Sequence, residues 1–261
     1  MRESCRAMNR RTFLAMTIAT AASALPSFAA EDNRCFELRV YYTEPGRLDA
    51  LHARFRDHTC KLFEKHGMTN LGYWVPINNP DGKLVYVMAY PSREAREASW
   101  KAFMADPDWN AARKASEESG KIVTKVESML LGALDFSTEI KPGVAAPRIF
   151  ELRTYTSTPG NLERLLSRFR DHTRNLFARH GMTNLWYWKL MPGQPGTGST
   201  LVYLLAHKDE LTARVSWAGF RADPDWITAR TASEKDAGGS LTAANGVKSE
   251  MLKATDYSPT K

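Results

Sequence analysis

The chain has 261 residues, of which 43% are hydrophobic and 25% are charged. This is the composition of an ordinary globular protein, and it excludes the disordered and fibrous classes. The formal net charge is +7, but its meaning depends on the N-terminal segment.

The first 29 residues have the features of an export signal. Arg10 and Arg11 precede an apolar run that extends to Leu25, and Ala29 is a small residue at the position that signal peptidase requires. The Arg-Arg-x-Phe-Leu order resembles a twin-arginine signal, with the general secretory route as the alternative. The apolar run is much shorter than the roughly 20 residues of a membrane anchor. We therefore expect cleavage after Ala29 and a periplasmic or secreted protein that has no membrane span after cleavage.

Cleavage would also change the charge and the cysteine content. It would remove four arginines and one glutamate, so the formal net charge would fall from +7 to +4. A mildly basic, exported protein is not expected to bind nucleic acid. Cys35 and Cys60 would remain, and an oxidising compartment permits a disulfide, but Cys60 is predicted on the outer side of a helix, which disfavours one. The sequence has no Cys-x-x-Cys, His-Glu-x-x-His or phosphate-loop pattern, so we predict no metal site.

An internal repeat dominates the rest of the chain. Residues 36–74 align without a gap onto 150–188, and residues 84–117 align onto 201–234. The chain is therefore two copies of one domain of about 100 residues. The predicted boundaries are 1–29 for the signal, 34–136 for the first domain, 137–148 for a linker that contains Pro and Gly, and 149–257 for the second domain.

Each copy follows the order strand, helix, strand, strand, helix, strand. In the first copy, residues 36–42 alternate as a strand does, and the helix that follows is expected to end at Gly67. A hairpin comes next, and a second helix begins near Ser92. Pro107 interrupts this helix and opens a new helical turn, which Asp106 can cap. The β-α-β-β-α-β order predicts a ferredoxin-like domain, with both helices on one face of an antiparallel sheet.

The first strand of each copy has one apolar and one polar side. The apolar side carries Phe36, Leu38 and Val40, or Phe150, Leu152 and Thr154 in the second copy. The polar side carries Glu37, Arg39 and Tyr41, or Glu151, Arg153 and Tyr155. Charged residues under a helix layer would cost several kcal/mol unless paired. We therefore expect the apolar sides to meet the helices and the polar sides to face each other, which gives an α+β fold of two tandem ferredoxin-like domains paired as an intramolecular α/β barrel.

The polar interior of this barrel is the predicted ligand site. Arginine offers a planar fork of donors and tyrosine a hydroxyl on an apolar ring, which suits a small anionic or oxygenated ligand. The candidate ligand-binding residues are Glu37, Arg39, Tyr41, Tyr86, Tyr90, Glu151, Arg153, Tyr155, Tyr203 and His207. Internal Glu–Arg salt bridges are the alternative. His207 replaces Tyr90, and it is either a titrating or metal-binding group or a surface residue at the end of a strand.

The string RFRDHT occurs at 54–59 and again at 168–173. At about 100° per residue, Asp57 points away from the apolar stripe of the helix and His58 lies beside the stripe, so the two cannot form an acid–base pair. Thr59 is on the buried side, where its hydroxyl can bond back to a helix carbonyl. The string therefore predicts a helix rather than a catalytic triad. His66 and His180 are expected to stabilise the negative end of a helix, and the tryptophans are expected to be core residues.

The repeated strings F-E-L-R-x-Y, H-G-M-T-N-L and D-P-D-W resemble the NIPSNAP family, whose domains belong to the dimeric α/β-barrel group. The resemblance covers essentially the whole mature chain and implies the fold described above. It implies little about mechanism; animal members are linked to mitochondria and vesicle traffic. Proteins that share only the barrel include monooxygenases and haem enzymes, some of which bind iron through a helix histidine, so His58 and His172 are haem candidates by that analogy.

Three functions follow as hypotheses. The first is a barrel that binds a small organic ligand. The second is a monooxygenase or isomerase, in which Arg39 or Arg153 stabilises an enolate-like anion and a tyrosine or His207 moves protons. The third is a structural or protein-interaction module. The ligand, the cofactor and further oligomerisation of the intramolecular pair stay open.

Overall fold

The structure is a computed structural model that describes residues 32–143 and 148–261. The predicted signal, 1–29, lies outside the described residues, and so do residues 144–147 of the predicted linker.

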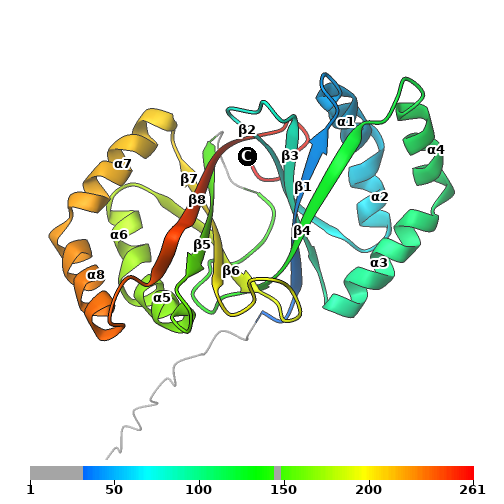
Figure 1. The fold of residues 1–261 in the computed structure, drawn as a ribbon. Helices are drawn as coiled ribbons and strands as arrows, with labels where there is room; N and C mark the ends of the chain where they lie inside the picture. The colour runs from blue at the N-terminus through cyan, green and yellow to red at the C-terminus, as the bar shows by residue number, and fades with distance from the viewer. Residues whose placement is uncertain (1–31, 144–147) are drawn as a thin grey trace, which may run out of the picture. The chain divides into compact units, whose positions relative to one another are not determined.

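The two halves of the chain have the same order of elements (Figure 1). The first half consists of β1 (Cys35–Thr43), α1 (Leu48–Arg54), the π-helical turn η1 (Phe55–Thr59), α2 (Cys60–Lys65), β2 (Thr69–Pro76), β3 (Lys83–Tyr90), α3 (Arg93–Ala105), α4 (Pro107–Ser116) and β4 (Val123–Ala133). The second half consists of β5 (Ile149–Ser157), α5 (Leu162–Arg168), the π-helical turn η2 (Phe169–Thr173), α6 (Arg174–Arg179), β6 (Thr183–Leu190), β7 (Thr200–His207), α7 (Glu210–Ala222), α8 (Pro224–Asp236) and β8 (Thr242–Ala254).

The helix boundaries follow local signals in the sequence. Ser92 caps α3 by accepting a hydrogen bond from the amide of Ala95, and Asp106 caps α4 by accepting one from the amide of Asp108. Gly67 follows α2 with a φ of 76°, a backbone conformation that glycine adopts without strain. These three predictions are confirmed.

The repeated RFRDHT string forms a π-helical turn rather than a regular α-helix. In the first half, Thr59 donates a hydrogen bond of 3.1 Å to the carbonyl of Arg54, five residues earlier. Thr173 makes the same bond to Arg168 in the second half. The back-bonding threonine was expected, but the wider turn was not, because propensities do not distinguish a single π turn from an α-helix.

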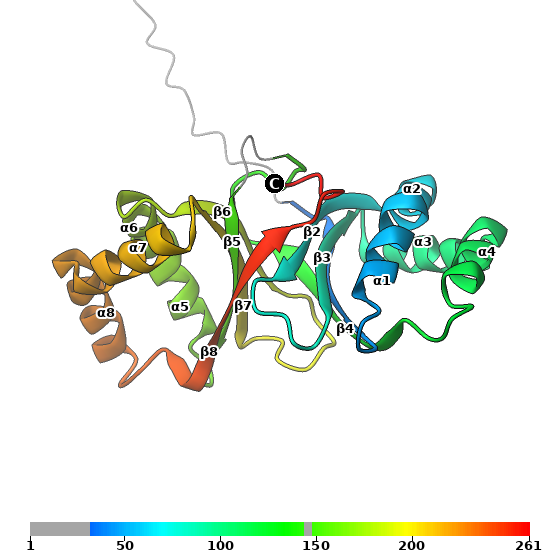
Figure 2. The same ribbon diagram turned by 90° about the horizontal axis from the view of Figure 1, so that it is seen from above.

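The eight strands form one closed barrel in the order β1-β3-β2-β8-β5-β7-β6-β4. The helices lie outside the barrel on two flanks (Figure 2). Within a half, β1 and β3 pair over eight residues, whereas the halves join at β2–β8 and β4–β6 over three residues each. The predicted α+β barrel of two tandem domains is confirmed.

The predicted orientation of the first strands is wrong. Phe36, Leu38 and Phe150 belong to the apolar cluster inside the barrel, whereas Glu37 and Arg39 lie on the side that meets the helices. An eight-stranded barrel is just wide enough for its interior to be filled by side chains. A polar interior would place two carboxylates and two guanidiniums in a closed space, far from the donors that the helices supply.

The two halves fill the barrel interior unequally. Trp74, Trp186 and Trp188 are buried there and pack against one another. Gly72 is the counterpart of Trp186 in the alignment of the halves. A Cβ atom at Gly72 would overlap the ring of Trp74, so the absence of a side chain at this position leaves room for Trp74.

The segment that follows the last strand of each half, here called its tail, packs against the other half. Ser137, after β4, accepts a hydrogen bond of 3.0 Å from the amide of Tyr187. Ser258, after β8, accepts one of 2.9 Å from the amide of Tyr73. Ile140, within the predicted linker, is buried among the side chains of the barrel interior. The halves therefore exchange tails as well as strand edges.

Cys35 and Cys60 are both free thiols in the described part of the chain, and Cys35 is buried. Burial raises the pKa of each thiol to about 11. No helix among residues 32–143 and 148–261 is both long enough and apolar enough to cross a membrane.

Candidate functional site

The predicted site residues form two clusters, one in each half, between the sheet and the helix layer. The first contains Glu37, Arg39, Tyr41, Tyr86 and Tyr90. The second contains Glu151, Arg153, Tyr155, Tyr203 and His207. The sequence thus identified residues that lie together, but the two sets do not meet across the barrel interior as predicted, because that space holds the apolar cluster.

Glu37 is the centre of the first cluster and is fully buried. Its carboxylate accepts hydrogen bonds from Arg39 Nη1 at 2.6 Å, Ser128 Oγ at 2.6 Å, Arg96 Nη2 at 2.7 Å, Trp100 Nε1 at 2.9 Å, Arg96 Nε at 3.0 Å and the Tyr90 hydroxyl at 3.0 Å. Burial alone would raise the pKa of this carboxyl, but the bonds from Arg96, the charge of Arg39 and the bond from Ser128 lower it to about 2. Glu37 is therefore ionised at neutral pH.

Arg39 is held in place on two sides and retains donors for another group. Glu37 binds its Nη1, and its guanidinium lies 4.3 Å from the centre of the Trp100 ring. Its Nη2 donates to the hydroxyl of Tyr41 over a long distance of 3.5 Å. The Nε of Arg39 and the hydroxyl of Tyr86 are buried without a hydrogen-bond partner among the described residues.

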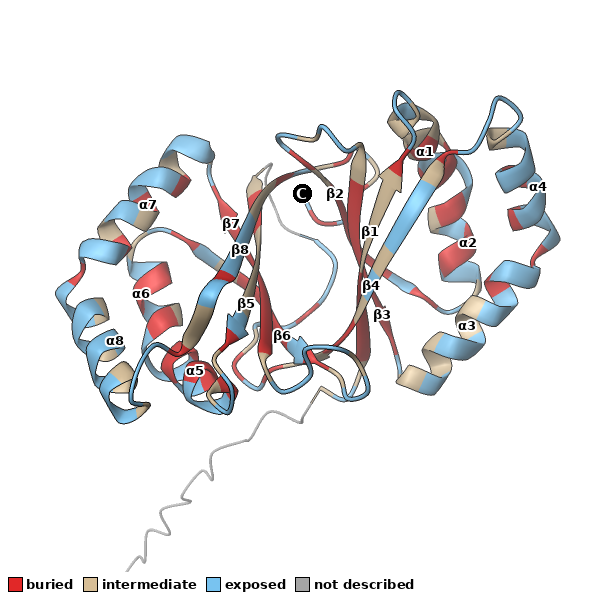
Figure 3. Ribbon diagram, in the orientation of Figure 1, coloured by how far each residue is buried: buried red, intermediate tan, exposed pale blue. Residues whose placement is uncertain are grey.

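The first cluster is open toward solvent along β4. The side chain of Arg39 is 13% exposed and that of Arg96 is 22% exposed. Val126 and Ser128, on the helix side of β4, are exposed, and Figure 3 shows exposed residues along both β4 and β8. Both arginines are therefore partly accessible to solvent.

The second cluster repeats this arrangement around Glu151. Its carboxylate accepts hydrogen bonds from Arg153 at 2.5 Å, Ser249 at 2.5 Å, Trp217 at 2.7 Å and His207 Nε2 at 2.9 Å. Burial opposes ionisation here too, but the bond from His207 and the charge of Arg153 lower the pKa of Glu151 to about 2. Arg153 lies 4.2 Å from the Trp217 ring.

Two positions differ between the clusters. His207 replaces Tyr90, and Ala213 replaces Arg96. His207 is 1% exposed, so the alternative of a surface residue at the end of a strand is wrong. Its Nδ1 is buried and has no partner among the described residues. In the first cluster two guanidiniums donate to the carboxylate of Glu37. In the second cluster one guanidinium and one imidazole donate to the carboxylate of Glu151.

The family of the chain is shown by its sequence. The NIPSNAP family model matches residues 36–138 and residues 150–259. The chain belongs to the NIPSNAP family. No curated protein matches the sequence.

Several solved structures are similar to this NIPSNAP protein. A candidate monooxygenase from Fusobacterium nucleatum is 13% identical, with a TM-score of 0.55 over 85% of this chain and 92% of that chain. An anthrone oxidase-like protein is 13% identical, with a TM-score of 0.56 over 88% of this chain and 95% of that chain. A NIPSNAP-like domain protein from Burkholderia xenovorans is 17% identical and covers 42% of this chain and 94% of its own, with a TM-score of 0.38. The first two similarities show the fold alone, because identities of 13% do not carry an activity from one protein to another.

Several residues of the clusters around Glu37 and Glu151 were not identified from the sequence. Trp100 and Trp217 were predicted as core residues, yet each donates to a buried glutamate. Arg96 stands four residues before Trp100 on α3, a spacing that places both on one face, so a signal for it existed. Ser128 lies on β4, far from Glu37 in sequence, and no local pattern indicates it.

Four of the other five histidines bind a carboxylate or are exposed. His66 ends α2, as expected, and its Nε2 lies 2.7 Å from the carboxylate of Asp106. His180 makes the same contact with Asp223 at 2.6 Å. His58 and His172 are exposed. Within residues 32–143 and 148–261, no three His, Cys, Asp or Glu side chains are arranged to hold a metal ion.

Proposed function

We propose that this NIPSNAP protein binds a small oxygenated or anionic organic ligand in each half, beside Arg39 and beside Arg153. The proposal places the ligand between the sheet and the helices, because the barrel interior is filled by side chains.

One observation carries this proposal. In both halves an arginine is anchored by a buried glutamate and stacked on a tryptophan, and its Nε is left without a partner among the described residues. A buried donor without a partner costs about 1–3 kcal/mol. A carboxylate, carbonyl or hydroxyl of a ligand would supply the acceptor, and the ring of the tryptophan would offer it an apolar wall.

A second candidate function is an enzyme of the monooxygenase or isomerase type. The contact between His207 and Glu151 favours it, because a neutral imidazole that donates from Nε2 carries its lone pair on Nδ1. In that case Arg153 would stabilise an enolate-like anion and His207 or a tyrosine would move the proton.

We also propose that the protein is exported by its twin-arginine-like signal. The support is the order of Arg10, Arg11 and the apolar run that follows. The mass of the mature chain, purified from its own host, would then correspond to residues 30–261. Replacement of Arg10 and Arg11 by lysine would retain the precursor in the cytoplasm; export at an unchanged level would contradict the twin-arginine route.

Native mass spectrometry of the mature protein tests the ligand proposal. We expect a reproducible excess mass that is lost in the variant Arg39→Met/Arg153→Met and kept in Arg113→Met, which changes an exposed arginine of α4. A bare mass in the wild type would contradict ligand binding. If the double variant also unfolds no more easily than the wild type, the clusters are structural ion pairs, which apolar residues often replace without loss.

A further inference from the structure

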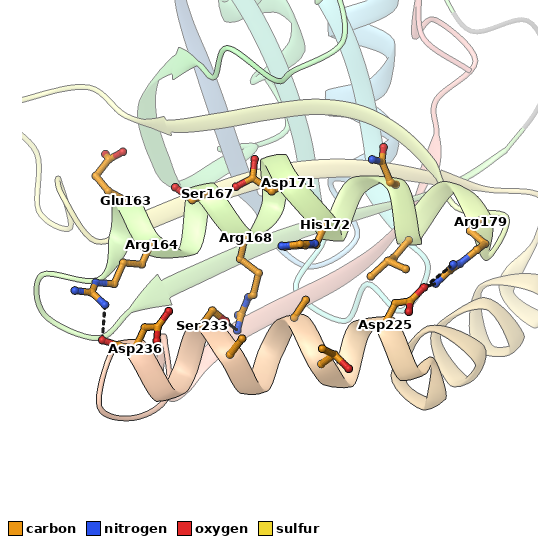
Figure 4. Close-up of a pocket in the computed structure, with 15 residues that line it drawn as sticks. Glu163, Arg164, Ser167, Arg168, Asp171, His172, Arg179, Asp225, Ser233 and Asp236 are labelled. Atoms are coloured by element: carbon orange, nitrogen blue, oxygen red, sulfur yellow. Dashed lines mark hydrogen bonds and ion pairs between the residues drawn. The ribbon is translucent and has the colours of Figure 1, made fainter.

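A groove of about 830 Å³ lies between two helical segments of the second half. One wall is the continuous helix formed by α5, η2 and α6, and the other wall is α8 (Figure 4). This volume is within the range of pockets that hold small organic molecules. The groove lies outside the two glutamate clusters, and the RFRDHT string at 168–173 supplies part of its lining.

Basic side chains form the wall that faces α8. Arg164, Arg168 and His172 follow one another at intervals of four residues along the helix, and all three are on the side of α8 in Figure 4. Glu163 and Asp171 also line the groove, but both are exposed and their side chains point away from α8 in Figure 4. The side chains that this wall directs toward α8 are therefore mainly basic.

The acidic residues of α8 that line the groove lie near its ends. Asp225 is bound by Arg179 at 2.9 Å. Asp236 is exposed, and its main-chain carbonyl accepts a hydrogen bond of 2.6 Å from Arg164. The middle of the groove, between these two ends, is left to Arg168, His172 and small residues of α8.

Arg168 is the best-placed binding group of the groove. Its side chain is 4% exposed, and the nearest carboxylate that the structure describes is Glu234, at 3.6 Å. Its Nη1 donates a hydrogen bond of 3.3 Å to Ser233, while its Nε has no partner among the described residues. Burial lowers the pKa of this guanidinium, and the charge of Glu234 offsets the effect only in part. The positive charge of Arg168 is thus incompletely neutralised by the protein.

The first half provides an internal comparison. Arg54, the counterpart of Arg168, also has a buried Nε without a partner among the described residues, but its guanidinium is closer to a carboxylate, at 3.1 Å from Glu117. Trp109 and Ala112 of α4 are buried, whereas none of the residues of α8, all of which the structure describes, is buried. Three alanines of the first half, Ala50, Ala53 and Ala111, are replaced at the groove by Arg164, Ser167 and Thr228. The second half therefore has polar side chains at three positions where the first half has alanine.

We propose that this groove binds a small organic oxyanion, a carboxylate or a phosphate ester, with Arg168 as the main binding group and Arg164 and His172 beside it. A planar guanidinium matches either group through paired hydrogen bonds. Leu176, Ala229 and Ala232 offer an apolar surface for the body of the ligand. This site is separate from the clusters at Glu37 and Glu151 and does not depend on the function proposed for them.

Calorimetric titration of the full mature chain tests the proposal with three probes. Benzoate and phenyl phosphate carry the two oxyanions, and benzyl alcohol is a neutral counterpart of similar shape. We expect one of the anions to bind the variant Arg39→Met/Arg153→Met, which lacks the other proposed sites, with one site per chain. Benzyl alcohol should bind at least about tenfold more weakly, the effect of losing one charge-assisted contact. The anion that binds more tightly identifies the ligand as a carboxylate or a phosphate ester. Equal binding of benzyl alcohol, or binding of neither anion, would overturn the proposal.

Two matched variants locate the site. Ala232→Trp fills the groove from an exposed position of α8, and Ala115→Trp makes the same change at the equivalent exposed position of α4. We expect anion affinity to fall about tenfold or more in the first variant and to stay unchanged in the second.

Arg164→Ala, which places the residue of the first half at this position, should weaken anion binding as well. Arg39→Met/Arg153→Met should leave it unchanged, so that failure here and failure of the proposed function are told apart. Full affinity in Ala232→Trp would refute the assignment.

Discussion

Arg96 binds Glu37 through two hydrogen bonds, one of 3.0 Å from Nε and one of 2.7 Å from Nη2. The second half has Ala213 at this position, so Glu151 has one arginine partner where Glu37 has two. The same buried carboxylate is therefore surrounded by different charges in the two halves.

Replacement of Arg96 by alanine should destabilise the protein by about 2 kcal/mol, because a buried carboxylate loses two charge-assisted bonds while Arg39 still neutralises it. Urea unfolding monitored by tryptophan fluorescence measures the change. Lys101→Ala, at an exposed position of the same helix, should change the free energy of unfolding by less than about 0.5 kcal/mol. Equal stability of the two variants would show that Arg96 contributes nothing to the burial of Glu37.

Replacement of His207 should depend on whether the new side chain can still donate to Glu151. His207→Tyr places the residue of the first half in the second, where a hydroxyl can reach the carboxylate as Tyr90 does at 3.0 Å. We expect a cost below about 1 kcal/mol for this variant and about 1–3 kcal/mol for His207→Leu, which removes the donor. The difference between the two unfolding free energies is the test, and no difference would mean that the bond to Glu151 is dispensable.

Low pH should lower the free energy of unfolding, because Glu37 and Glu151 become protonated. The pKa of each is about 2 in the folded protein, below the usual value of about 4.3 of an unfolded chain. The two ionised carboxylates therefore stabilise the folded state fully above about pH 5. This contribution to the free energy of unfolding is lost as the pH falls toward 2, and the loss is about 3 kcal/mol for each group. Measurements of the unfolding free energy between pH 7 and pH 3 give its dependence on pH.

A double variant controls for other carboxylates in that experiment. Glu37→Gln/Glu151→Gln should be less stable at pH 7 and should lose less stability between pH 5 and pH 3 than the wild type. Glu118→Gln, at an exposed position, should follow the wild type. A double variant with the slope of the wild type would assign acid sensitivity to other groups.

Replacement of Gly72 by alanine should cost about 1–3 kcal/mol, because the added methyl group would overlap the ring of Trp74 inside a filled barrel. Gly132→Ala is the matched control in β4, since the nearest atom to a Cβ there is 4.0 Å away. Thermal unfolding of both variants checks the prediction. An unchanged melting temperature in Gly72→Ala would mean that the interior is packed more loosely than the structure indicates.

The order of the elements could be predicted from the sequence because its signals are local. Ser92, Asp106 and Gly67 each act within a few residues of their position, and the repeat shows each signal twice. The π-helical turn at 55–59 could not be predicted, because it depends on one additional residue in a helix whose composition is ordinary.

The direction of the polar strand face could not be predicted from alternation alone. Alternation separates Phe36 from Glu37 but does not say which one points into the barrel. The cost of burying Glu37 under the helices is offset by Arg96, Trp100 and Ser128, which donate to it from distant parts of the chain. A better signal lies in β3, where Val85, Val87 and Ala89 point inward and the larger Tyr86, Met88 and Tyr90 point to the helices, as a narrow barrel requires.

The exchange of tails through Ser137 and Ser258 joins the halves as two subunits of a dimer would be joined. A dimer encoded by one domain must carry every substitution twice, since its subunits have one sequence. Here both halves lie on one chain, so the second half can carry His207 and Ala213 while the first half carries Tyr90 and Arg96. A substitution in one half can therefore change its binding surface without changing the other half.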